Sequence, residues 1–312
     1  MNDVIDYSRF ADRLAAARAA GPEHRWDLLR EFQAEWGYTP SDGPRWFGED
    51  LAEHQLLVRY LSRPEAAVDE WPVAHRDEIK KLRAERGGEE TGDRYDRPPI
   101  PEALTQWWLL PENSFADKAK LYWTHPEWPP TWRPDPNGYG VGKELPKNSP
   151  YRKPGEDPRL CVFMAEYEYC NEWGYLASEA RLDDPRVLVS VGRDWVEQAS
   201  SVSEFFLRIA VDRLPDHFGW TGHLGPDADA EKVPTLVRAQ LPEVGLLPWR
   251  ELAAHSVVHG GPDVLVALDS GKGDVPPVRV YGRTHEAVAA LGRQLGIDWS
   301  IREPLSQTRP LE

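Results

Sequence analysis

Residues 160–191, LCVFMAEYEYCNEWGYLASEARLDDPRVLVSV, contain the pattern from which we predict the fold class. It holds three runs with the apolar composition of β-strands, at 160–164, 173–176 and 187–191. The turn signal Asp-Asp-Pro precedes the third run. Short strands joined by turns, with helices on either side of them in the chain, predict an α+β protein with antiparallel sheet.

The segment that follows these strands predicts a helix. Residues 201–204, Ser-Val-Ser-Glu, have the form of a capping box, in which the Ser and Glu side chains satisfy free N–H groups at a helix start. Phe205, Phe206 and Ile209 supply the apolar face. We expect Pro215 to end this helix and residues 215–230 to form a connector.

The last hundred residues predict two more strands and a helix. The strands are at 264–268 and 278–281, and the helix follows with Thr284 as its N-cap and Gly296 as its C-cap. We expect this part to form a C-terminal α/β extension over residues 216–312.

The N-terminal third has a helical pattern. Trp26, Leu29, Phe32 and Trp36 recur at steps of three or four, which places them on one helix face. We predict a helical N-terminal region that ends in a linker, over residues 1–97 in all.

A second domain is predicted to begin at residue 98. It opens with a short helix that has Pro101 in its first turn and ends at Pro111. The domain continues through the strands to residue 215, and residues 124–158 within it are rich in Pro and Gly and are expected to be irregular.

The charge balance bears on partners and location. The chain has 312 residues and a formal net charge of −15. This charge disfavours nucleic acid and anionic membranes and favours a basic protein partner, although it also serves solubility alone. The chain shows no signal peptide and no apolar stretch of bilayer length, so we expect a cytoplasmic protein.

The known chemical motifs are incomplete in this sequence. Residues 138–143, Gly-Tyr-Gly-Val-Gly-Lys, lack the leading Gly and the Ser or Thr of a phosphate loop. His255 and His259 lie in a strand-like segment, where they would be too far apart for one metal ion. Cys161 and Cys170 do not have a redox or zinc spacing, and Cys161 is expected in the core. We therefore predict no catalytic residue, cofactor or metal, and a protein that is not an enzyme.

An acidic and aromatic segment is the candidate binding surface, because aromatic side chains anchor protein interfaces and charges steer them. Two alternatives stay open. Paired carboxylates here are also suited to a hydrolase or transferase, and Tyr167 and Trp173 alternatively face the core while the glutamates are solvated. The candidate residues are Glu166, Tyr167, Glu168, Tyr169, Glu172 and Trp173.

Residues 98–215 resemble the SUKH superfamily. The resemblance rests on the Leu- and Trp-bearing helix at 100–108, the strand at 162–166 followed by Asn-Glu-Trp-Gly-Tyr at 171–175, the turn at 183–187 and the closing helix from 201. Leu-Pro-Glu-Asn at 110–113 stands where the family usually has a Gly-rich stretch.

The resemblance implies a SUKH-like mixed sheet with flanking helices and no catalytic residues. Many bacterial members of this family are immunity proteins that bind and block a toxin, often a nuclease. It therefore implies an immunity or regulatory protein that neutralises a basic toxin domain, and a non-catalytic scaffold whose N-terminal helices pair with a partner helix is a further alternative.

Overall fold

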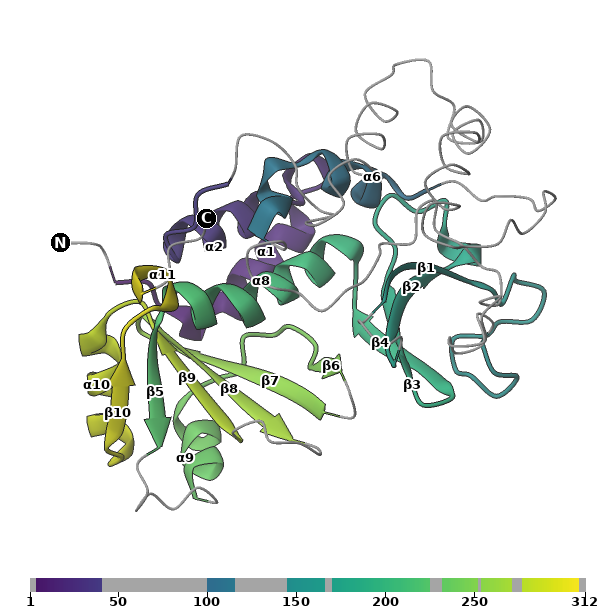
Figure 1. Ribbon diagram of the computed structural model, residues 1–312. Helices are drawn as coiled ribbons and strands as arrows, with labels where there is room; N and C mark the ends of the chain where they lie inside the picture. Colours follow the sequence, from purple (N-terminus) through teal and green to yellow (C-terminus); the bar gives the residue numbers. More distant parts are fainter. Residues whose placement is uncertain are drawn as a thin grey trace, which may run out of the picture. The chain divides into compact units, whose positions relative to one another are not determined.

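The computed structural model describes residues 4–40, 100–115, 145–165, 170–224, 232–251, 254–270 and 277–308. Helices combine with antiparallel sheets, so the predicted α+β class is confirmed (Figure 1). The chain forms two compact units. Unit 1 joins Met1–Thr39 to Ser203–Glu312, and unit 2 spans Pro40–Val202.

These units are bounded differently from the parts predicted at 1–97, 98–215 and 216–312. The first helices belong with the C-terminal strands because long-range contacts hold them there. The Ile5 N–H donates to Asp263 Oδ1 at 2.9 Å, and the Asp263 N–H donates to the Ile5 carbonyl at 2.7 Å. Such contacts leave no local pattern in the sequence.

Unit 1 is built on a six-stranded sheet in the order β10-β5-β9-β8-β7-β6, with every neighbouring pair antiparallel. The strands are β5 (Trp220–Leu224), β6 (Trp249–Glu251), β7 (Ala254–Gly261), β8 (Val264–Ser270), β9 (Val278–Gly282) and β10 (Trp299–Arg302). The predicted strands at 264–268 and 278–281 are β8 and β9.

One face of this sheet packs against α9 (Val233–Gln240) and α10 (His285–Leu295). Alternate residues of β8 point toward these helices, because side chains along a strand alternate between faces. The buried core on this face includes Val264, Val266, Val280, Val288 and Leu291.

The opposite face carries α8 (Val202–Phe218) and the N-terminal helices α1 (Phe10–Ala19) and α2 (Asp27–Glu35). Phe205 of α8 packs on Trp249 of β6, with ring centroids 5.6 Å apart. The predicted apolar face of α2 is confirmed. It is buried in an aromatic cluster of unit 1 formed by Tyr7, Phe10, Phe32 and Trp36.

Helix α8 begins at the predicted capping box but does not end at Pro215. Pro215 lies inside the helix, which continues to Phe218. A proline within a helix lacks one N–H and typically costs ~3 kcal/mol. Leu214 and Pro215 are both buried, so apolar burial offsets that cost here.

Helix α10 has both predicted caps. Thr284 is the N-cap, and its Oγ1 accepts from the Ala287 N–H at 3.1 Å, while Gly296 closes the helix in the left-handed region at φ 68°.

Replacing Thr284 with alanine is expected to lower the free energy of unfolding by about 1 kcal/mol, because a free N–H at the helix start loses its acceptor. Urea denaturation measures the change. Thr284→Ser keeps the hydroxyl and should stay within a few tenths of the wild type. Equal losses in the two variants would contradict the capping role.

Unit 2 contains a four-stranded antiparallel sheet in the order β1-β2-β3-β4. The strands are β1 (Leu160–Ala165), β2 (Glu172–Leu176), β3 (Val187–Val191) and β4 (Asp194–Ala199). The three predicted strands are present, and β4 was not expected from the sequence. One face of the sheet buries Leu145, Leu160, Val162, Leu188 and Trp195.

The predicted short helix is α6 (Glu102–Leu109), which ends before Pro111 as expected. Pro101 is its N-cap rather than a residue of the first turn. Both tryptophans of the helix, Trp107 and Trp108, are fully buried. The Asn113 amide donates to the Trp107 carbonyl at 2.9 Å, so it satisfies a helix-end acceptor.

Candidate functional site

The predicted binding residues divide into two groups. Glu166, Tyr167, Glu168 and Tyr169 lie outside the described residues. Glu172 and Trp173 belong to β2 and are 0% exposed. We expected these two side chains on an exposed binding surface, and that expectation is wrong. The burial of Trp173 matches the core-facing alternative, but Glu172 is not solvated.

A network of hydrogen bonds fixes the start of β2. The Asn171 amide donates to the Ser190 carbonyl at 2.6 Å, and the Glu172 N–H donates to Ser190 Oγ at 2.8 Å. Glu172 also pairs with Ala165 across the β1–β2 ladder. Residues 166–171 therefore join two strands that are paired with each other and buried.

The two histidines considered as metal ligands lie on strand β7, as their sequence context indicated. The Nδ1 atom of His259, which is buried, lies 2.9 Å from the Leu241 carbonyl, and His255 is exposed beside Ser270. Within the described ranges, no three His, Cys, Asp or Glu side chains gather as a metal site requires. Residues 138–143 lie outside those ranges.

The cysteines differ in environment. Cys161 is fully buried in β1, which confirms its predicted place in the core, and burial raises the pKa of its thiol well above the usual range. A buried thiol with a raised pKa is a poor nucleophile. Cys170 is exposed next to the start of β2.

A cluster of charged side chains between α8 and the sheet was not predicted. Asp212 of α8 lies 3.2 Å from Arg279 of β9 and 3.7 Å from Arg208 of α8. Arg279 also contacts Asp269 of β8 at 2.6 Å. The side chain of Arg208 is only 2% exposed, and its guanidinium donates to the Ser256 carbonyl at 3.0 Å.

Burial and charge act in opposite directions on these groups. Burial lowers the pKa of Arg208 to about 10, and nearby Asp212 offsets only part of that effect. Burial would raise the pKa of Asp212, but Arg279, Arg213 and Arg208 outweigh it, so the pKa of this carboxyl lies well below its usual range. Asp212 therefore stays ionised inside the protein.

The cluster continues toward the surface along the same face of the sheet. Arg279 donates to the Tyr281 hydroxyl at 3.1 Å, and that hydroxyl donates to Asp216 at 3.2 Å. On neighbouring β5, burial and Arg302 both lower the pKa of His223, which leaves its imidazole neutral near pH 7. Each buried charge in this cluster has an opposite charge beside it. The ion pair between Asp212 of α8 and Arg279 of β9 therefore holds the helix against the sheet.

A sequence signal for this cluster exists. Arg208, Asp212 and Asp216 are spaced four apart, which places all three on one face of a helix. That polar stripe runs beside the apolar residues of α8, so the apolar pattern alone did not reveal it.

None of the helices in the described part of the chain has the length and apolar character needed to cross a bilayer. Comparison with family models, with curated proteins and with solved structures found no match to this chain.

Proposed function

We propose that this chain is a binding protein that engages a basic protein partner, and that the partner is a toxin domain which it blocks. The observation that carries the proposal is the net charge of −15. A nuclease that grips phosphates is basic, and opposite fields speed association and reject wrong partners.

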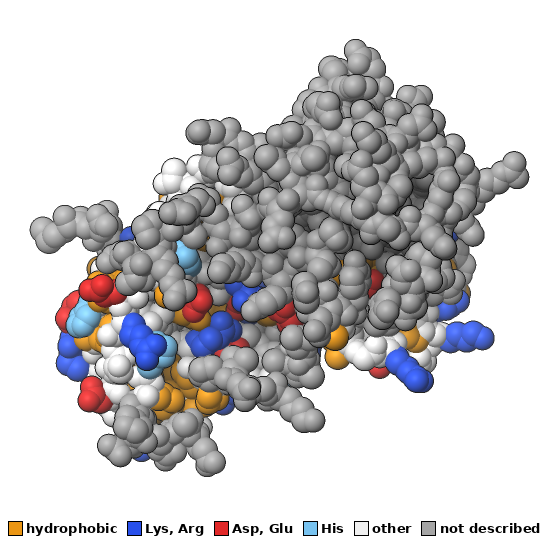
Figure 2. Space-filling view, in the orientation of Figure 1, with side chains coloured by type: hydrophobic (Ala, Val, Ile, Leu, Met, Phe, Trp, Pro, Cys, Tyr) orange, Lys and Arg blue, Asp and Glu red, His pale blue; other side chains and the backbone are white. Residues whose placement is uncertain are grey.

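We propose that residues 166–171 form the surface that contacts the partner. This segment joins β1 to β2, and all residues of both strands are buried. Glutamate and tyrosine side chains in such a connection combine steering charges with aromatic anchors. The described surface visible in Figure 2, by contrast, mixes acidic, basic and histidine side chains without one dominant sign. The test therefore concentrates on residues 166 and 168.

The scaffold alternative meets a structural obstacle. It needs an apolar face of the N-terminal helices to pair with a partner helix, but Phe10, Phe32 and Trp36 are already buried inside unit 1. The described part of these helices thus has its apolar side occupied.

The experiment begins with capture of partners from the native host's lysate by the tagged chain, at low and at high salt. A captured basic protein, or a basic toxin domain encoded by a neighbouring gene, is then purified and its affinity measured by calorimetry. We expect direct binding that weakens as salt rises, because exposed charge contacts are screened.

Charge reversal locates the surface. Glu166→Lys with Glu168→Lys is expected to weaken binding by roughly tenfold or more, since a charge buried at an interface contributes about 2 kcal/mol. The matched control reverses the exposed carboxylates Glu156 and Asp194 of unit 2, which changes the net charge equally.

Three outcomes are informative. A loss of affinity in the Glu166→Lys, Glu168→Lys variant but not in the control supports residues 166–171 as the binding surface. Equal loss in both means that only net charge matters and removes the segment from the proposal. If the chain does not bind a neighbouring basic toxin domain at low salt, the proposed function is overturned.

A further inference from the structure

Strand β10 is the last strand at one end of the six-stranded sheet. Its inner side pairs with β5 in a regular register, from Trp299 opposite Leu224 to Arg302 opposite Thr221. Among the described residues, the backbone of β10 makes no hydrogen bond other than those to β5. The outer side of such a strand presents N–H and C=O groups in a row, and a further strand can pair with them.

The other edge strands of the two sheets differ from β10. In unit 2, the Glu197 N–H of β4 donates to the Tyr151 hydroxyl at 3.2 Å, so a side chain covers part of that edge. Strand β1, at the other edge of the same sheet, is buried along its whole length. Strand β6, at the far end of the sheet in unit 1, has only three residues. Strand β10 is therefore the edge best placed to accept another strand.

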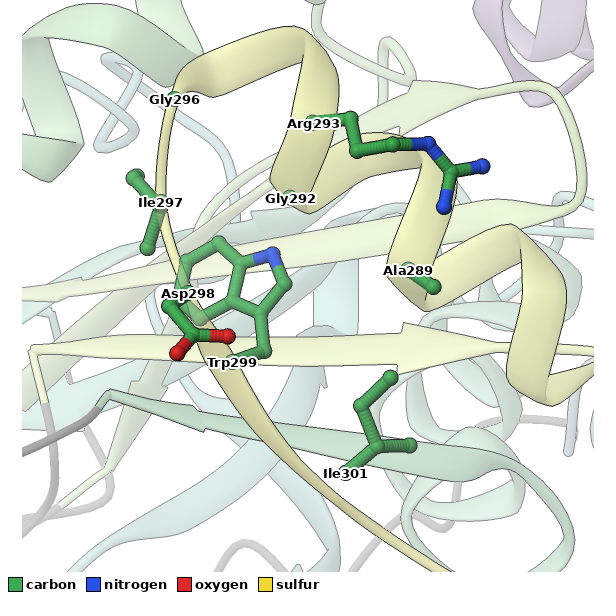
Figure 3. Close-up of a pocket in the computed structure, with 8 residues that line it drawn as sticks. All are labelled: Ala289, Gly292, Arg293, Gly296, Ile297, Asp298, Trp299 and Ile301. Carbon is green, nitrogen blue, oxygen red and sulfur yellow. The ribbon is translucent and has the colours of Figure 1, made fainter.

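An open groove of about 440 Å³ borders this edge (Figure 3). All the residues that line it belong to α10, to β10 or to the turn between them, and they include Ala289, Asp298 and Ile301. Trp299 and Ile301 point from the strand toward the helix in Figure 3, and Ile301 is only half-buried. A strand added at the edge would lie about 4.8 Å from β10 and cover Ile301 from the open side.

The sequence around β10 is complementary to itself. In an antiparallel pairing of two copies centred on Ser300, Trp299 of one copy lies opposite Ile301 of the other, so apolar side chains meet on the α10 side. Asp298 of one copy lies opposite Arg302 of the other. Asp298, Ser300 and Arg302 are all exposed. Each contact occurs twice about the two-fold axis, and opposite charges across two strands stabilise their pairing.

The register follows from the same residues. A slip by one residue would move the apolar side chains to the other face of the sheet, away from α10. A pairing centred on Trp299 would put Arg302 opposite Gly296, and one centred on Ile301 would put it opposite Ser300. Of these residue-centred pairings, the one on Ser300 brings both the opposite charges and the apolar side chains together.

We propose that two copies of this chain associate through their β10 strands, antiparallel and centred on Ser300, so that the two sheets become one. The net charge of −15 on each copy opposes association at long range. At about 0.15 M salt that repulsion is screened beyond roughly 8 Å, and directly opposed side chains lie closer than this. The edge belongs to unit 1 and residues 166–171 to unit 2, so this inference stands apart from the partner proposed above.

The test measures the mass of the full chain in solution. Sedimentation velocity and light scattering at physiological salt, from micromolar to submillimolar concentration, should show a monomer–dimer equilibrium. Asp298→Arg and Arg302→Asp should each weaken self-association roughly tenfold or more, because each change puts like charges opposite each other at two symmetric positions. The control Arg238→Asp reverses an exposed charge on α9 and should leave the equilibrium unchanged.

Mixing the two single variants tests the register directly. When an Asp298→Arg chain pairs with an Arg302→Asp chain, every contact between positions 298 and 302 again joins opposite charges. We therefore expect the mixture to form a heterodimer with an affinity near that of the wild type. The double variant Asp298→Arg with Arg302→Asp exchanges the two charges within one chain and should recover self-association in the same way.

A chain that stays monomeric up to submillimolar concentration overturns the proposal. So does a dimer that neither single variant weakens, since it would use another surface. Failure of both the mixture and the double variant to recover association would contradict the register. Both positions are exposed, so the variants leave the core of unit 1 intact, and circular dichroism of each variant checks this.

Discussion

Replacing Asp212 with asparagine is expected to lower the free energy of unfolding by about 3–5 kcal/mol, because removal of one partner from a buried ion pair leaves the other charge without compensation. Asp212 lies between Arg208 and Arg279, and its side chain is 5% exposed. The change keeps the size of the side chain and removes only its charge. Urea denaturation followed by tryptophan fluorescence and circular dichroism measures the loss.

The effect should depend on pH in a defined direction. The pKa of Asp212 is below its usual value of 3.8 in the folded protein, so its ionisation stabilises the fold above about pH 4. That contribution is lost as the pH falls below 4 toward the folded pKa. The difference between wild type and Asp212→Asn should therefore be largest near neutral pH and shrink toward pH 2.

Glu286→Gln is the matched control, since it removes the charge of a carboxylate that pairs with arginine at the surface. The exposed Glu286–Arg293 pair should contribute no more than about 1 kcal/mol. Similar losses for the two substitutions, or a pH-independent difference for Asp212→Asn, would contradict the role assigned to the buried cluster.

Replacing Gly260 with alanine should be comparably severe, on the order of 4 kcal/mol, in the range that marks core disruption. An alanine Cβ would lie 2.2 Å from the backbone oxygen of Tyr7 and 2.5 Å from its carbonyl carbon. Backbone cannot rotate away as a side chain does, so the N-terminal segment must leave strand β7. The hydrogen bonds between Ile5 and Asp263 would then be lost as well.

The neighbouring glycine provides the comparison. A Cβ on Gly261 would meet only the side-chain tips of Leu241 and Val264, each at 3.1 Å, and these tips can move. Gly261→Ala should therefore cost about 1 kcal/mol. Thermal unfolding of both variants, with limited proteolysis of the first forty residues, makes the test. Equal effects at 260 and 261 would show that the Tyr7 contact does not limit stability.

Elements with local signals were predictable. Helix α10 carries its N-cap at Thr284 and its C-cap at Gly296, so the sequence alone predicted both ends. Strands β5 and β4 were missed because their apolar residues are few. Gly222 and His223 interrupt β5, and Asp194, Glu197 and Gln198 make β4 largely polar.

The candidate site was less predictable than the fold. Glu172 looks exposed by residue type, but its position in register with Ala165 places it in a strand that is buried along its whole length. Strand β10 pairs with β5, which lies about 75 residues earlier in the chain. No pattern within either strand specifies that pairing.

The hydrogen bonds between Ile5 and Asp263 have a consequence for synthesis of the chain on the ribosome. These residues are 258 positions apart, so at ~5–20 residues per second the first helices leave the ribosome roughly 10–50 s before their strand partners exist. During that interval the aromatic side chains of Tyr7, Phe10, Phe32 and Trp36 have no sheet to cover them. The nascent N-terminus thus exposes apolar surface during synthesis, and such surface is what chaperones bind.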